Sequence, residues 1–371
     1  RNIPGDGKFD QDSPPNTVEL QVGRVDMYDM PAFSQTETQL LAAYLTKAHN
    51  FRIKGFTPQV RSIMRDHLED LTTPIAGSGW MSIPPMTGAA NLTEVAYNDV
   101  TWLQDLVNGQ SYLWTYGGGG GLIENDNGTL VFNSTDKVMT TAGLISTAWG
   151  GVFNMSFCSY TGDWDTRNNV LRAQITSGDA LTSVYAGSPN WWFHPMGMGK
   201  TTGHCTQLTM NNVSLYLPQS GGELNPAPRS ALALLGDPAL RMLNVAMPSN
   251  LIVSNNAGNA SFSWTAASGS PAGYHVYKFD ANGVPARVNT TLIVGTSFNS
   301  NQAYVAGTQY MVRAAKIETT ASGSWWNLSL GAQATAPASG PVLVNVDMLL
   351  EGPYDQVSGQ MNDDLRAAGL I

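Results

Sequence analysis

The chain has 371 residues, which is enough for two or three domains with cores of their own. Charged residues make up 13% of it and the net charge is -9, so it offers no basic surface for the phosphates of a nucleic acid. No apolar run reaches the ~20 residues that a membrane-spanning helix needs. Low charge together with abundant Gly, Asn, Ser and Thr indicates a secreted or cell-surface protein.

The two ends of the chain indicate whether it is part of a longer protein, and its two cysteines raise the question of a disulfide. Because it starts at Arg1 and stops in Ala-Ala-Gly-Leu-Ile, we interpret it as part of a longer multidomain chain. Cys158 and Cys205 are its only cysteines. They are able to pair in an oxidising compartment, and the sequence leaves that pairing open.

Residues 1–247 alternate predicted strands and helices. The predicted strands are residues 17–27, 109–117, 150–158 and 181–188. The predicted helices are residues 34–52, which open with the capping box Ser34 and Glu37, and residues 166–175. Such alternation favours an α/β domain with a mostly parallel sheet, in which sites form at the carboxyl ends of the strands.

From residue 248 the pattern changes to short runs of alternating apolar and polar residues parted by turn residues. This pattern predicts a β-sandwich over residues 248–336, with Trp264 and Tyr310 in its core. The stretch resembles a fibronectin type III module. After a linker rich in small residues, residues 341–371 resemble a segment of multidomain secreted bacterial proteins. They are expected to start a further β domain or, alternatively, to add a tail strand to the sandwich.

Five consecutive glycines, Gly117 to Gly121, follow a predicted strand rich in aromatic residues. Bare backbone N–H groups after a strand can cradle a phosphate when a helix follows. The sequence after the glycines, Leu-Ile-Glu-Asn-Asp-Asn-Gly, predicts no helix, and the run fits no phosphate-loop pattern. We therefore expect a flexible or tightly turned loop that uses the access of glycine to positive φ.

Two further groups of residues are candidate binding sites. Trp191, Trp192 and Phe193 follow a predicted strand end and are expected either to line a peptide or glycan groove or to cover the core. Hard oxygen ligands that suit calcium occur in two loops, and the alternative is that these loops are solvated turns. The calcium candidates are Asp6, Asp10, Asp12, Glu124 and Asp126. No other cofactor is expected.

Several stretches of residues 17–245 resemble the gingipain family of cysteine peptidases, whose fold is that of the caspases. The matching stretches are VGRVDMYDMPAFSQTETQLLAAYLTKAHNF from residue 22, SFCSYTGDWD from residue 156, VYAGSPNWWF from residue 184 and ALLGDPALRM from residue 233. The resemblance implies a caspase-like α/β fold. It also implies a site made by a histidine at the end of one strand and a cysteine at the end of the next.

Carried over residue by residue, the family pattern finds neither catalytic group in place. The histidine position falls on Gly119, and the nucleophile position falls on Ser159, with Cys158 as its neighbour. A serine without a base is a negligible nucleophile at neutral pH. His49 and His67 fall on predicted helices, so the histidines that remain for the site are His194 and His204.

The leading hypothesis is therefore a secreted or cell-surface bacterial protein with a non-catalytic, gingipain-like domain that acts as a structural or binding module. Its partner would be a protein or glycan ligand at the cell surface. One alternative is an active cysteine endopeptidase that uses Cys158 with His194 or His204. Another is a glycan-binding module that uses Trp191 and Trp192.

Overall fold

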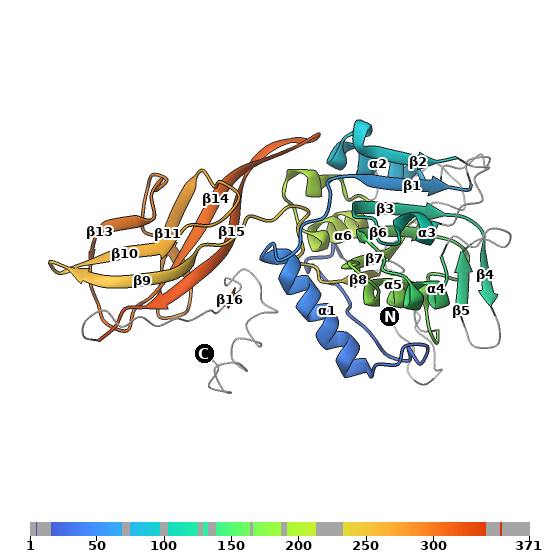
Figure 1. Cartoon of the computed structure of the whole chain (residues 1–371), viewed down its shortest axis with the longest axis horizontal. Helices are drawn as coiled ribbons and strands as arrows, with labels where there is room; N and C mark the ends of the chain where they lie inside the picture. The colour runs from blue at the N-terminus through green and yellow to red at the C-terminus, as the bar shows by residue number, and fades with distance from the viewer. Residues whose placement is uncertain are drawn as a thin grey trace. The chain divides into compact units, whose positions relative to one another are not determined.

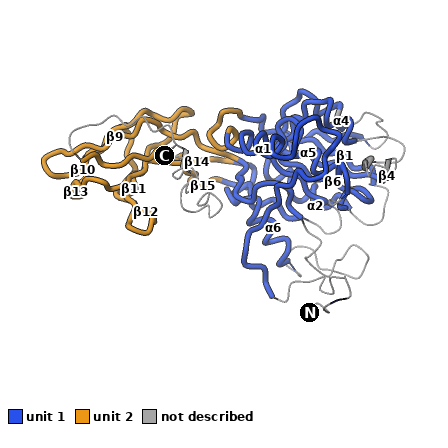
Figure 2. The backbone as a smooth tube through the Cα atoms, turned by 90° about the horizontal axis from the view of Figure 1, so that it is seen from below, with its two compact units in different colours: residues 1–49, 57–242, 320–323 blue, residues 50–56, 243–319, 324–371 orange. Residues whose placement is uncertain are grey.

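The computed structural model describes most of the chain, and two compact units make it up (Figure 1). Unit 1 contains residues 1–49, 57–242 and 320–323, and unit 2 contains residues 50–56, 243–319 and 324–371, as coloured in Figure 2. The residues described are 5, 16–68, 75–96, 103–124, 129–132, 139–163, 166–186, 191–212, 233–338 and 349–350. Within them no helix combines the length and the apolar character that crossing a membrane requires.

The described part of unit 1 is built on a six-stranded sheet in the order β2-β1-β3-β6-β7-β8 (Figure 1). Its parallel strands are β1 (Ser62–Asp66), β2 (Leu92–Val95), β3 (Tyr112–Gly118), β6 (Gly151–Phe157) and β7 (Thr182–Tyr185). The edge strand β8 (Leu234–Gly236) runs antiparallel to β7. The central strands β3 and β6 are buried almost throughout, as expected of parallel strands covered on both faces.

Helices cover both faces of this sheet. The register aligns Ser62 with Trp114 and Phe153 with Thr182, so these side chains share one face. On that face Ser62 Oγ lies 2.9 Å from Thr87 Oγ1 of α2 (Gly77–Thr87). Ser183 faces the other way, and its Oγ donates to Gln174 Oε1 of α5 (Val170–Thr176) at 2.6 Å. Unit 1 is thus a helix–sheet–helix sandwich.

The remaining elements of unit 1 lie around these layers. The helix α1 (Glu37–Arg52) contacts α5, because Lys47 Nζ donates to the carbonyl of Ile175 at 3.0 Å. The short helix η2 (His194–Met198) packs against α2 and α6 (Thr202–Asn211). The others are η1 (Ala89–Asn91), α3 (Leu103–Val107), α4 (Thr141–Ser146) and a hairpin of β4 (Gly121–Glu124) and β5 (Thr129–Phe132).

The start of α1 corrects one detail of the sequence analysis. The capping box is formed by Thr36 and Gln39, not by Ser34 and Glu37. Thr36 Oγ1 accepts from the N–H of Gln39 at 3.3 Å, and Gln39 Oε1 accepts from the N–H of Thr36 at 2.9 Å. Both pairs have the spacing of a capping box, and the structure forms the second.

Two other local predictions were wrong. Residues 17–27 form no strand and make only an isolated bridge, in which Arg24 pairs with Leu235 at the edge of β8. The predicted helix over 166–175 begins only at Val170, because Asn169 is its N-cap and accepts from the N–H groups of Leu171 and Arg172. For residues 17–27, the bridge to the distant residue Leu235 replaces the predicted strand pairing. For residues 166–175, the Asn169 cap delays the start of the helix.

Unit 2 is an antiparallel β-sandwich. Its three-stranded sheet has the order β13-β10-β9 and its five-stranded sheet the order β12-β11-β14-β15-β16. The strands are β9 (Ser249–Asn256), β10 (Asn259–Thr265), β11 (Gly273–Phe279), β12 (Pro285–Arg287), β13 (Ser297–Ala303), β14 (Gln309–Thr320), β15 (Gly323–Thr335) and β16 (Leu349–Leu350). Trp264 and Tyr310 are buried in its core, where the sequence places them.

The C-terminal segment is described only at β16. Leu349 and Leu350 pair antiparallel with Ala332 and Gly331 of β15, so these two residues extend the five-stranded sheet. The rest of the predicted segment 341–371 lies outside the described residues.

Candidate functional site

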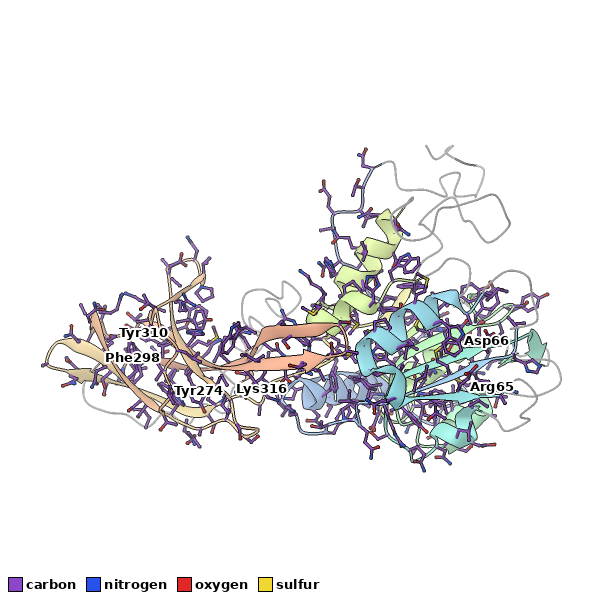
Figure 3. All side chains as sticks on the ribbon, turned by 90° about the horizontal axis from the view of Figure 1, so that it is seen from above. Arg65, Asp66, Tyr274, Phe298, Tyr310 and Lys316 are labelled. Carbon is purple, nitrogen blue, oxygen red and sulfur yellow. The ribbon has the colours of Figure 1, made fainter. Side chains whose placement is uncertain are left out.

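The candidate site is the carboxyl edge of the unit 1 sheet, where β1, β3, β6 and β7 end side by side. Figure 3 labels Arg65 and Asp66 at the end of β1. The backbone ladder continues past the strands, because the N–H of His67 donates to the carbonyl of Gly118 at 3.0 Å and the N–H of Gly119 to that of Phe157 at 2.9 Å. The residues after the three strands therefore lie in one row.

That row brings together His67, Gly119 and Cys158. Asp66 is in register with Gly118, and Gly118 with Phe157, so the next residue of each strand occupies the next step of the ladder. Gly119 stands between the histidine and the cysteine and contributes no side chain. Sequence analysis missed His67 by placing it on a helix, whereas the strand β1 ends at Asp66, directly before it.

The five glycines do not form a turn with positive φ, and the last of them is required by close packing. None of Gly117 to Gly121 has a positive φ, which corrects the expectation from sequence. A Cβ added to Gly121 would lie 2.0 Å from the carbonyl oxygen of Ser159 and 2.7 Å from its nitrogen. Gly121 thus packs against the backbone that follows Cys158. After Gly121 the chain continues as β4, so no helix N-terminus is present to complete a phosphate cradle.

Cys158 is fully buried directly after β6. Its Sγ lies 3.1 Å from Thr161 Oγ1, and its N–H donates to the same oxygen at 3.1 Å. Burial raises the pKa of the Cys158 thiol to about 12, and the hydrogen bonds from Thr161 offset that rise only in part. A thiol in this state is protonated at neutral pH and out of reach of a substrate.

The loop after Cys158 is held rigidly. Asn169, buried at the start of α5, donates through Nδ2 to the carbonyls of Thr161 and Asp163, both at 3.1 Å. Ser159 and Tyr160 are exposed at the tip of the loop, and Tyr160 has a φ of 70°. The loop therefore presents Ser159 and Tyr160 to solvent while it holds Cys158 inside.

The two histidines expected to serve Cys158 lie on the other side of the sheet. His194 begins η2 and His204 lies in α6, and both elements belong to the layer of α2. The loop of Cys158 is tied through Asn169 to α5 on the opposite face. Burial lowers the pKa of both imidazoles below the ordinary value of 6.5, with Lys200 adding to the effect at His204.

The aromatic cluster is part of the core. Trp191, Trp192 and Phe193 are 0%, 2% and 1% exposed, so they cannot line an open groove. The indole N–H of Trp191 donates to the carbonyl of Tyr185 at 2.6 Å, and the Phe193 ring lies 5.1 Å from that of Trp114. This arrangement matches the core-cover alternative and removes the basis for a glycan groove made of these tryptophans.

The remaining sequence candidates are a disulfide and a calcium site. Cys158 and Cys205 are both free and buried, so the disulfide that the sequence left undecided is not formed. Asp6, Asp10, Asp12 and Asp126 lie outside the described residues, and Glu124 is described only as backbone in β4. Among the residues that the structure does describe, no group of three or more His, Cys, Asp or Glu side chains is arranged to hold a metal.

Alkaline pH is expected to destabilise unit 1. Burial raises the pKa of Cys158 from 9.0 to about 12 and raises that of Cys205 as well. Above pH 9 the unfolded chain releases these protons while the folded chain keeps them. Their contribution to stability is therefore complete below pH 9 and is lost as the pH rises toward 12. Melting curves from pH 7 to 11 measure this loss. A variant with alanine at both positions should show a shallower decline, and an unchanged decline would contradict the assignment.

Comparison with known proteins gives distant structural similarities. No protein-family model and no curated protein matches the chain. One solved structure, described as a protease, aligns with 80% of this chain and 73% of its own at 10% identity and a TM-score of 0.44. A fibronectin type III-like protein from Clostridium thermocellum aligns with 24% of this chain and 90% of its own at 21% identity and a TM-score of 0.19. The described chain itself combines a mixed α/β unit with an antiparallel β unit.

Proposed function

We propose that unit 1 is a non-catalytic, gingipain-like peptidase domain that serves as a structural or binding module of a secreted or cell-surface bacterial protein. Unit 2 would be its fibronectin type III-like companion. The observation that carries the proposal is the state of Cys158, which is fully buried and hydrogen-bonded to Thr161.

The chemistry of thiol catalysis supports this proposal. A cysteine nucleophile reacts as the thiolate, and it needs both access to substrate and a partner that lowers its pKa. With a pKa of about 12, the thiolate fraction of Cys158 at pH 7 is on the order of one in 10⁵. Active cysteines shift in the opposite direction, to ~3.5–7.5.

A second candidate, a cysteine peptidase that uses Cys158, is favoured by the position of this residue at a strand end on the same edge as His67. Adjacent strands lie ~4.8 Å apart, so two strand spacings place the backbones of these residues about 10 Å from each other. His194 and His204 give this function less support. They lie in the layer of α2, whereas the loop of Cys158 is tied to α5 on the opposite face of the sheet.

Thiol labelling of the folded full chain distinguishes the two functions. A peptide chloromethyl ketone and iodoacetamide, each at pH 7.5, are expected to leave Cys158 unmodified over hours, because the buried thiol is protonated. Mass spectrometry locates any adduct. The same reagents in guanidinium chloride serve as the positive control, and a Cys205→Ala variant leaves Cys158 as the single thiol. Rapid labelling of the folded chain, or peptide cleavage that Cys158→Ala abolishes, would refute the non-catalytic function.

A further inference from the structure

The turn between β11 and β12 of unit 2 contains an exposed Asn–Gly pair, Asn282 and Gly283. Two more such pairs occur in the chain. Asn108–Gly109 belongs to unit 1, and Asn127–Gly128 lies outside the described residues. In an Asn–Gly pair the main-chain nitrogen of the glycine approaches the asparagine side chain closely, because glycine has no Cβ. The two described pairs are therefore compared as sites of a reaction between these groups.

The Asn282 turn is held through Asp280 and not through the Asn282 side chain. Phe279 pairs with Pro285 at the base of the turn. Asp280 Oδ1 accepts from the N–H of Asn282 at 2.9 Å and from the N–H of Val284 at 2.8 Å. The Asn282 side chain is exposed, and its amide has no hydrogen-bond partner among the residues described. This amide is thus free to rotate toward the nitrogen of the next residue.

Gly283 leaves its main-chain nitrogen accessible. Its N–H makes one hydrogen bond, to the carbonyl of Asp280 at 3.1 Å, which is toward the long end of the range for such bonds. Its φ is 76°, and no atom lies within 4 Å of an added Cβ. One hydrogen bond therefore has to open before this nitrogen reaches the Asn282 amide.

The Asn108 pair is held at both of its reacting groups. Asn108 Oδ1 accepts from the N–H of Ala148 at 3.0 Å, and the N–H of Gly109 donates to the carbonyl of Ala148 at 2.9 Å. Gly109 also has a positive φ, 65°, and open space around an added Cβ. The two pairs thus differ in restraint, because two hydrogen bonds have to open at Asn108 and one at Asn282.

We propose that Asn282 is a site of spontaneous deamidation. The nitrogen of Gly283 loses its proton to base and attacks Cγ of Asn282. The new C–N bond closes a five-membered succinimide, and the bond from Cγ to the side-chain nitrogen breaks, so that this nitrogen takes up a proton and leaves as ammonia. Water then opens the ring, at Cγ to give aspartate or at the main-chain carbonyl carbon to give isoaspartate. The net change consumes one water and releases one ammonia.

Either product alters the turn. A carboxylate appears two residues from that of Asp280, and a charge-changing modification of this kind acts through repulsion between like charges. Isoaspartate also adds a methylene to the main chain between the two N–H groups that Asp280 Oδ1 accepts from. The modification therefore weakens the hydrogen bonds that shape the turn, and it does not depend on the state of Cys158.

Incubation of the folded full chain at pH 8, followed by proteolysis and tandem mass spectrometry, measures conversion at each asparagine as a mass gain of about 1 Da. Asn282 is expected to convert at least about fivefold faster than Asn108, because one hydrogen bond fewer has to open. In guanidinium chloride the two asparagines should convert at similar rates, because the fold restrains neither. Asn282→Ser removes the amide and should abolish the mass gain in that peptide.

Three results would overturn the proposal. One is conversion in the folded chain that is as fast at Asn108 as at Asn282, or faster. Another is an Asn282 that stays intact in the folded chain while it converts in guanidinium chloride. The third is a rate at Asn282 that does not rise from pH 6 to pH 8, which would contradict the loss of a proton from the Gly283 nitrogen. None of these results bears on thiol labelling of Cys158, so failure here is distinguishable from failure of the non-catalytic proposal.

Discussion

Replacing Gly121 by alanine is expected to unfold unit 1 or to leave it barely stable. The new Cβ would lie 2.0 Å from the carbonyl oxygen of Ser159, and neither atom belongs to a side chain that can rotate away. Either the glycine run or the loop after Cys158 must shift, which costs at least about 3 kcal/mol of the free energy of unfolding. Guanidinium chloride denaturation followed by circular dichroism measures this loss.

A matched glycine provides the control. Gly295 has no atom within 4 Å of its added Cβ and no positive φ, so Gly295→Ala should change stability by less than about 1 kcal/mol. If Gly121→Ala were as stable as Gly295→Ala, the glycine run and the Ser159 backbone would not be in contact. The account of the glycines as a packing requirement would then be wrong.

Asn154→Ala is expected to destabilise unit 1 by about 3–5 kcal/mol, because it breaks a buried network in the middle of β6. Asn154 Oδ1 accepts from Thr115 Oγ1 at 2.6 Å and from the indole N–H of Trp149 at 2.8 Å. Its Nδ2 donates to the carbonyl of Thr182 at 2.8 Å and to two carbonyls near the start of its own strand. Alanine leaves these partners buried without a replacement.

The comparison for this variant is Asn108→Ala, which removes one exposed hydrogen bond to the N–H of Ala148 in the same unit. That change should cost at most about 1 kcal/mol. Thermal unfolding of both variants, followed by tryptophan fluorescence, tests the difference. Equal melting temperatures would show that the Asn154 network contributes no more than a surface contact.

Local patterns in the sequence predicted part of the layout of the chain, since β3, β6 and β7 were expected but β1 and β2 were not. Buried parallel strands such as β3 and β6 are rich in apolar and aromatic residues, and the half-buried strands of unit 2 give period-two alternation, so both types are visible without tertiary information. The alternation of strands and helices up to about residue 245, and the change to a sandwich after it, followed from these patterns. The start of α1 was recognised to within a few residues, although the capping box that forms is Thr36 with Gln39 and not Ser34 with Glu37.

The site depended on contacts that local patterns do not encode. The sequence by itself predicted that Cys158 ends a strand and that Gly117 to Gly121 follow another strand of the same sheet. Only the tertiary structure decided that His67 joins the same row, that Gly121 touches the Ser159 backbone and that Trp191 is core. The physical reason is that burial, close approach and pKa are set by neighbours far away in the chain, whereas strand and helix periodicity are set by neighbours a few residues away.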